Sequence, residues 1–197
     1  TNGLQQIADD YGATLAGATA LSSGTPLSGV IASPTDVDAF TFTASGATTV
    51  DVTPAEVAPD LDTRLRIYDG TQALVATIDP AVAMTNASTA TGLGATYSFT
   101  ATPGTYYATV DGTGFGDPLT NGYSNYGSRG RYSVSLSTTP LGAVSVSTTQ
   151  LSEATVGVPY NASLASTGGT APVTWTKESG NLPPGVSLAS DGTLSGT

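Results

Sequence analysis

Hydrophobic and polar residues alternate in short runs between residues 27 and 136, and Gly, Pro, Asp and Asn separate the runs. Alternation with a period of two is the pattern of half-buried β-strands. The predicted strands are Leu27–Ile31, Asp38–Thr43, Thr48–Thr53, Arg64–Tyr68, Ala73–Ile78, Ala95–Ala101, Thr105–Val110 and Arg131–Leu136. Eight such strands predict an all-β fold, a jelly-roll-like antiparallel β-sandwich.

The connections between these strands carry turn signals of their own. Asp69-Gly70 and Pro103-Gly104 each separate two strand runs, so each predicts an antiparallel hairpin. The long stretch from Asp79 to Ala95 is expected to contain a further short strand near 82–85. The glycine-rich stretch 111–130 also holds aromatic residues, which predicts a loop that packs on the sandwich surface.

The two ends of the chain predict separate units. Residues 1–8, with a short helical pattern at 4–8, are interpreted as the tail of a preceding domain, and the sandwich is expected over 9–138. After a linker at 139–142, residues 143–197 are again β-like, with runs at 143–148, 159–165, 172–176 and 193–195. An immunoglobulin-like (Ig-like) sandwich takes about 100 residues. The second unit is therefore expected to be a small or truncated Ig-like sandwich.

The first long strand combines acidic and aromatic residues on one face. Asp36, Asp38, Phe40 and Phe42 alternate, so their side chains point the same way in an extended chain. Two carboxylates ~6.6 Å apart on a face that turns toward the core are unfavourable unless a cation lies with them.

Composition limits what that cation is. The chain has 15 acidic and 5 basic residues, a net charge of −10, and neither Cys nor His. At least ten carboxylates lack a basic partner, whereas thiolate sites, imidazole-based catalysis and the usual zinc sites are excluded. The negative charge argues against nucleic acid or an anionic membrane as a partner. No apolar run approaches a membrane span and no leader is visible, so we expect no membrane insertion and an interior piece of a longer protein.

Several motifs, in order, resemble the bacterial pre-peptidase C-terminal domain. They are Asp9-Asp-Tyr-Gly12, Gly29-Val-Ile-Ala-Ser-Pro-Thr-Asp-Val-Asp-Ala-Phe-Thr-Phe42, Leu61-Asp-Thr-Arg-Leu-Arg-Ile-Tyr-Asp69, Gly104-Thr-Tyr-Tyr-Ala-Thr-Val-Asp-Gly112 and Gly122-Tyr-Ser-Asn-Tyr-Gly-Ser-Arg-Gly-Arg-Tyr132. The resemblance covers about residues 9–137. It implies a non-catalytic β-sandwich of a secreted bacterial hydrolase, with a peptidase favoured, and similarity to the collagen-binding domains of collagenases.

The segment from Asn181 to Thr197, with Val158-Pro-Tyr160 before it, resembles the Ig-like (cadherin-like) repeats of bacterial surface proteins. Together the two resemblances imply a secreted or cell-surface location and an upstream catalytic domain in the same polypeptide as a partner. The implied roles are binding of a protein or polysaccharide substrate and domain spacing. A structural stalk or adhesin segment, and a C-terminal segment removed during secretion and maturation, are the alternatives.

Calcium fits the acidic residues around the first long strand. Asp9 and Asp10 from the entering segment and Asp36 and Asp38 from the strand supply only oxygen ligands, which calcium prefers. The calcium site of the collagen-binding relatives implies the same place. The alternative is that these are solvated turn and cap residues.

Two further sets of residues are candidates. Asp60, Asp62, Asp111 and Asp117 could hold a second ion, or Asp62 could pair with Arg64 or Arg66 while the others form turns. Tyr107, Tyr123 and Tyr126 could form a ligand-binding surface, because tyrosine combines a rigid face with a polar tip. One of Tyr106 and Tyr107 must instead face the core. Carboxylate pairs such as Asp36 with Asp38 are nominal glycosidase pairs, but sugar-stacking aromatics are scarce, so no catalytic activity is predicted.

Overall fold

A computed structural model describes residues 8–57, 59–86, 89–120, 122–169 and 172–197. The chain divides into two compact units, Thr1–Pro140 and Leu141–Thr197. All but the last residue of the helical pattern expected at 4–8 lies outside the described residues. Unit 1 contains the 3-10 turn η1 (Leu15–Gly17) and the strands β1 (Thr19–Ala20), β2 (Leu27–Ile31), β3 (Val37–Pro54), β4 (Thr63–Tyr68), β5 (Leu74–Ile78), β6 (Ala83–Asn86), β7 (Thr89–Thr91), β8 (Ala95–Gly112) and β9 (Gly130–Thr139).

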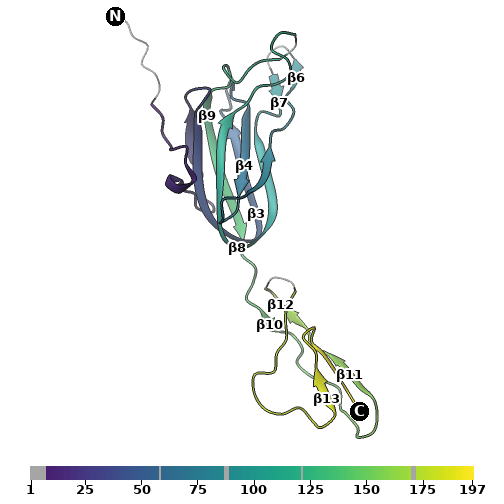
Figure 1. Cartoon of the computed structure of the whole chain (residues 1–197). Helices are drawn as coiled ribbons and strands as arrows, with labels where there is room; N and C mark the ends of the chain where they lie inside the picture. Colours follow the sequence, from purple (N-terminus) through teal and green to yellow (C-terminus); the bar gives the residue numbers. More distant parts are fainter. Residues whose placement is uncertain (1–7, 58, 87–88, 121, 170–171) are drawn as a thin grey trace, which may run out of the picture. The chain divides into compact units, whose positions relative to one another are not determined.

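Unit 1 is a two-layered β-sandwich built around β3 and β8 (Figure 1). Residues 37–44 of β3 pair with 104–111 of β8, and this half continues through β4 to β5 and carries β1 on its other side. Residues 46–52 of β3 pair with 95–101 of β8, and β3 continues on its other side through β9 to β2. Apart from the parallel pair β1·β3, these pairings are antiparallel, which confirms the all-β sandwich prediction.

The predicted hairpin at Pro103-Gly104 is wrong. The segments before and after it do not pair with each other but form the single strand β8, and both run along β3. The predicted strands at 38–43 and 48–53 are likewise one strand. The register shifts between Ala44 and Gly46, where Gly46 has a φ of 77° that suits glycine. A bulge of this kind bends a strand without ending it.

The hairpin predicted at Asp69-Gly70 is confirmed, since β4 and β5 pair antiparallel on either side of it. Asp69 organises the turn by accepting hydrogen bonds from the backbone N–H groups of Thr71 and Ala73. The positive φ falls on Gln72, at 66°, and not on Gly70. The short strand expected near 82–85 is present as β6, and it pairs with β7.

The core of unit 1 lies between the layers and follows the alternation of the sequence. Phe40, Phe42, Val50 and Val52 from β3 are buried there with Leu65, Ile67, Val110, Val134 and Leu136 from the neighbouring strands. Burial of the alternate residues of β3 confirms that Asp38 shares the inward face with Phe40 and Phe42. Asp38 itself is fully buried, at 0% exposure.

Unit 2 consists of short strands: β10 (Ser145–Val146), β11 (Tyr160–Ser163), β12 (Ser166–Thr167), β13 (Val186–Leu188) and β14 (Thr193–Gly196). β14 lies between β11 and β13 in one sheet, and β10 pairs with β12. The strand expected at 172–176 is not formed, whereas β13 was not expected. The Ig-like identity of this unit stays a prediction. In the described part of the chain, no helix has the length and apolar character needed to cross a membrane.

Candidate metal centre

The candidate centre lies where the segment before η1, residues 8–14, meets the start of β3; this segment is called the lead-in. A turn, closed by the hydrogen bond from the Asp36 N–H to the Ser33 carbonyl at 3.2 Å, brings the chain into β3. The lead-in is held against the strand, because the Gly12 carbonyl accepts a 3.0 Å hydrogen bond from the Ala39 N–H. Tyr11 packs edge-on against Phe40 at 5.0 Å and donates a hydrogen bond to the Ser28 carbonyl. These contacts fix the segment that carries Asp9.

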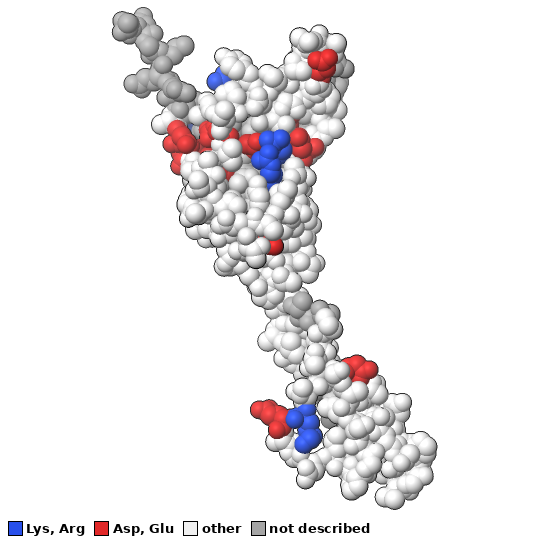
Figure 2. All heavy atoms as spheres, viewed as in Figure 1, with Lys and Arg blue, Asp and Glu red and all other residues white. Residues whose placement is uncertain are grey.

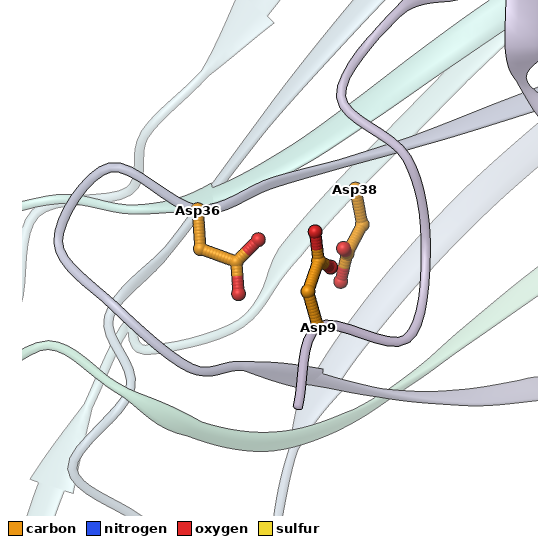
Figure 3. Close-up of side chains that lie close together, drawn as sticks. All are labelled: Asp9, Asp36 and Asp38. Carbon is orange, nitrogen blue, oxygen red and sulfur yellow. The ribbon is translucent and has the colours of Figure 1, made fainter. Parts of the chain in front are cut away.

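Three carboxylates converge at this point. Each of Asp9, Asp36 and Asp38 places a carboxylate oxygen within 4.8 Å of the other two. Figure 3 shows the Asp9 carboxylate beside that of Asp38, with the Asp36 carboxylate pointing toward both. Asp9 is exposed, Asp36 is half-buried and Asp38 is buried, so the cluster opens to solvent on the side of Asp9.

Hydrogen bonds orient two of these carboxylates and leave one buried oxygen without a partner. Asp36 Oδ2 accepts a 2.6 Å hydrogen bond from the Ala32 N–H. Asp38 Oδ2 accepts a 2.5 Å hydrogen bond from the Tyr132 hydroxyl, whereas Asp38 Oδ1 is buried with no hydrogen-bond partner in the described structure. A buried carboxylate oxygen in this state is costly unless something else compensates it.

Tyr132 reaches Asp38 because of a glycine on the neighbouring strand. Gly29 of β2 lies directly opposite Tyr132 of β9 in the antiparallel pairing. A Cβ atom at position 29 would lie 2.4 Å from the tyrosine ring, so that the ring would have to shift. The absence of a side chain at Gly29 thus makes room for the Tyr132 ring. Both residues belong to the motifs quoted above, but neither was predicted to contribute to this centre. Alternation with Val134 and Leu136 indicates that Tyr132 faces inward, but the sequence carries no signal for its contact with Asp38.

Burial and the charges of neighbouring carboxylates favour the neutral forms of Asp36 and Asp38. The pKa of Asp38 is raised to about 7, chiefly by burial and also by the charges of Asp36, Asp10 and Asp9, while the Tyr132 hydrogen bond opposes the increase. Burial also raises the pKa of Asp36, together with Asp9 and Asp10, while the Ala32 hydrogen bond opposes the increase. A divalent cation between the carboxylates would reverse this balance.

Asp10, predicted as a fourth ligand, is placed differently. Its Oδ1 accepts a 3.3 Å hydrogen bond from the Val30 N–H, which ties the lead-in to β2. The structure does not include it among the three converging carboxylates, although its charge reaches Asp36 and Asp38.

The second predicted set, Asp60, Asp62, Asp111 and Asp117, is not brought together as one cluster. Asp111 of β8 lies opposite Arg64 of β4 and bonds its guanidinium at 2.5 Å, while Arg66 bonds the same carboxylate at 3.1 Å. The suggested pairing of Asp62 with these arginines is therefore wrong, because the cross-strand register gives them Asp111. In the view of Figure 2, basic side chains of unit 1 lie between acidic ones in one band of charge.

The other members of that set have separate surroundings. Asp117 accepts a hydrogen bond from the Leu119 N–H within its own turn, and Asp60 is exposed. Asp62 is buried, and its Oδ2 accepts a 2.9 Å hydrogen bond from the Tyr123 hydroxyl. Because Asp62 immediately precedes β4, this contact confirms that the glycine-rich loop packs on the sandwich. Within the loop, Tyr123 also packs against Phe115.

The three predicted surface tyrosines differ in exposure. Tyr126 is 70% exposed and lies under the Arg129 guanidinium, 5.2 Å from the ring centre. Tyr107 faces outward on β8, opposite Thr41 and Tyr68, since Tyr106 takes the core side. Tyr123 is used inside the structure by Asp62 and Phe115, so its inclusion in a binding surface does not fit its contacts.

Neither a family model nor a curated protein matches the chain. Among solved structures, the pre-peptidase C-terminal domain of a collagenase from Bacillus anthracis is similar to 60% of this chain and is covered over 93% of its own length, at 19% identity and a TM-score of 0.40. PliG from Salmonella Typhimurium, a periplasmic inhibitor of g-type lysozyme, is similar to 60% of this chain and is covered over 95%, at 16% identity and a TM-score of 0.34.

Proposed function

We propose that unit 1 is a calcium-stabilised, non-catalytic accessory domain of a secreted bacterial hydrolase, in which a peptidase is the favoured catalytic partner. The assignment of the parent protein and of its location rests on the sequence motifs quoted above. The proposal of calcium rests on the geometry of Asp9, Asp36 and Asp38.

The observation that carries the proposal is the unpartnered, buried Oδ1 of Asp38 within a group of three carboxylates. The ion pairs in the described structure join Arg64 and Arg66 to Asp111, so neither arginine neutralises this group. The negative charge of the three carboxylates is therefore not neutralised by an arginine, and Oδ1 of Asp38 can still accept an interaction.

The residues fit calcium. Two oxygens that each lie 2.3–2.6 Å from one calcium ion are at most about 5 Å apart, and the three carboxylate oxygens meet this limit. The donors are oxygens, with neither nitrogen nor sulfur, and the exposed side of Asp9 leaves room for water ligands. Calcium would supply positive charge at the Oδ1 atom of Asp38 and neutralise all three carboxylates.

The consequence for function is mechanical. Asp9 belongs to the lead-in, whereas Asp36 and Asp38 belong to the turn and first strand of the sandwich, so a shared ion would lock the lead-in onto the domain. The direction in which a preceding catalytic domain leaves the sandwich would then depend on calcium. Extracellular calcium-binding modules work at dissociation constants of about 10⁻⁴ to 10⁻³ M, which suits a secreted protein.

Thermal unfolding of the full chain tests the proposal. With millimolar calcium, the melting temperature should exceed that in chelator by several degrees, because a ligand that binds only the folded state stabilises it. Asp36→Asn should reduce this shift, while Glu56→Gln, which changes an exposed acid elsewhere on unit 1, should retain it. Superimposed melting curves of the wild-type chain with and without calcium would contradict the proposal.

A structural stalk or adhesin segment is the second candidate, and one observation favours it. The Tyr123 hydroxyl, predicted to touch a ligand, is instead bonded to the buried Asp62. The predicted binding surface thereby loses one of its three tyrosines. A stalk would keep the calcium dependence of stability but would bind no protein or polysaccharide.

A further inference from the structure

We propose that unit 1 holds a second divalent-cation site, formed by Asp62, Asp79 and Thr113 at a place separate from the Asp9, Asp36 and Asp38 cluster. It retains one member of the sequence-predicted second set, Asp62, and adds Asp79, which the sequence analysis did not single out. The cation chemistry it fits is that of calcium.

Asp62 presents a fixed and incompletely satisfied carboxylate. The residue is 1% exposed, and its Oδ2 accepts the hydrogen bond from Tyr123, yet its Oδ1 is buried without a hydrogen-bond partner in the described structure. Its backbone is held on both sides, because its N–H donates to Ser128 Oγ at 2.9 Å and its carbonyl accepts from the Ser128 hydroxyl at 3.0 Å. A rotation of the carboxylate toward solvent would break its hydrogen bond with Tyr123.

Thr113 joins Asp62 to Asp79. The Thr113 N–H donates a 2.9 Å hydrogen bond to the Asp62 carbonyl. The Thr113 Oγ1 lies 3.4 Å from Asp79 Oδ2 and 3.4 Å from the Gly114 carbonyl, both long for hydroxyl hydrogen bonds. Oxygens that share one calcium ion lie up to about 5 Å apart, so these spacings suit common coordination.

The electrostatics of this place also call for a cation. Burial raises the pKa of Asp62 and of Tyr123, and the negative charge of Asp79 adds to the increase in both groups. The pKa of Arg64 is raised mainly by its hydrogen bonds to Asp111 and to a smaller extent by the charge of Asp79. In the described ranges, neither Asp62 nor Asp79 takes part in an ion pair.

A cation at this place would connect three elements. Asp62 immediately precedes β4, Asp79 immediately follows β5, and Thr113 begins the glycine-rich loop after β8. The donors are carboxylate, hydroxyl and carbonyl oxygens, which are hard ligands suited to calcium, with water completing the coordination. The ion would fasten the end of the hairpin β4·β5 and the loop that carries Tyr123.

Metal stoichiometry of the full chain tests this proposal, measured by calorimetric titration with calcium and by sensitised terbium luminescence. Tyr123 touches Asp62 and Tyr132 touches Asp38, so each site has its own tyrosine to sensitise bound terbium. We expect two ions per chain in the wild type. Asp79→Asn, which changes an exposed residue, should abolish one of them or weaken it at least tenfold, and Asp60→Asn, another exposed acid nearby, should bind as the wild type does.

The Asp38→Asn variant separates this proposal from the first. It should retain one ion, which the added Asp79→Asn change should remove. A wild-type chain that binds a single ion, lost in Asp38→Asn and kept in Asp79→Asn, would overturn the second site and leave the first in place. A single ion that is kept in Asp38→Asn and lost in Asp79→Asn would overturn the site at Asp38 and support the site at Asp62. Two ions in Asp79→Asn, or none in the wild type, would overturn the site at Asp62.

Discussion

Tyr132 donates a 2.5 Å hydrogen bond to Oδ2 of Asp38, although 94 residues separate the two in sequence. Both side chains are buried, so the hydroxyl is the only described hydrogen-bond donor to a carboxylate that lies beside two others. Tyr132 is thus the residue that orients the Asp38 carboxylate, and it would position that carboxylate for the proposed cation.

Removal of that hydroxyl should destabilise unit 1. In Tyr132→Phe, Oδ2 of the buried Asp38 loses its hydrogen bond, so that neither carboxylate oxygen has a donor. We expect a loss of about 1–3 kcal/mol in the free energy of unfolding. Urea unfolding in chelator measures it. Tyr107→Phe, which removes an outward-facing hydroxyl from β8, is the matched control and should change stability little. Equal effects of the two changes would contradict the role of Tyr132.

The stability of the calcium-free chain should fall as the pH rises from about 4 to about 7. The folded-state pKa values of Asp38, about 7, and Asp62, about 6, lie above the ordinary value of 3.8. Between these limits the folded state binds more protons than the unfolded state, so a rise in pH favours unfolding. Unfolding free energies at pH 5 and pH 7.5 in metal-free buffer check this, and Asp38→Asn should flatten the slope. An increase of stability over this range would show that the carboxylates are not destabilised by burial.

Gly29→Ala should disrupt the centre from the opposite strand. The new methyl group would lie 2.4 Å from the Tyr132 ring. The ring would therefore have to move, and its hydrogen bond to Asp38 would weaken. Overpacking of this kind costs about 1–3 kcal/mol, and the affinity for calcium should fall with it. Gly12→Ala, where no atom lies within 4 Å of the added carbon, is the control for both measurements. Unchanged calcium affinity in Gly29→Ala would argue that Tyr132 does not shape the site.

Asp111→Asn should destabilise unit 1 to the same extent with and without calcium. Asp111 serves Arg64 and Arg66 in an ion pair, so its loss leaves two partly buried guanidinium groups without a carboxylate partner. Calorimetric titration should still give the calcium stoichiometry of the wild-type chain. Loss of a calcium ion in this variant would instead indicate that Asp111 is a metal ligand.

Binding to insoluble collagen, chitin, cellulose and cell-wall preparations separates the accessory-domain proposal from the stalk. If the surface binds a polymer, Tyr126→Ala should abolish retention, because this ring is the exposed one. Tyr123→Phe should leave retention in place and lower stability through the lost Asp62 contact. The absence of wild-type retention on every polymer would favour the stalk.

The sequence predicts the strands of unit 1 well because alternation is a local property of half-buried strands. The continuity of β8 through Pro103 and Gly104 could not be read in the same way. Proline and glycine occur both in hairpin turns and in bends within a strand. Only the pairing of both flanking segments with β3 shows that Pro103 and Gly104 lie within one strand.

The candidate centre shows the same division. Alternation placed Asp38 on the buried face with Phe40, as observed, and the excess of acid suggested a cation beside it. The contact with Tyr132 and the pairing of Asp111 with Arg64 depend on the register between strands distant in sequence. Asp79 follows the end of a strand and belongs to no pattern, so only the three-dimensional arrangement brings it to Thr113, whose N–H is bonded to the Asp62 carbonyl.

The bend that β3 and β8 share near Gly46 has a mechanical consequence. Each of these strands contributes one half to either layer, so the sandwich is a single ribbon doubled over upon itself. A pull on one layer would be transmitted to the other through covalent backbone, and the layers cannot slide apart as two independent sheets could. Force that separates the layers must therefore break the pairing within the long strands or straighten the backbone at the bend.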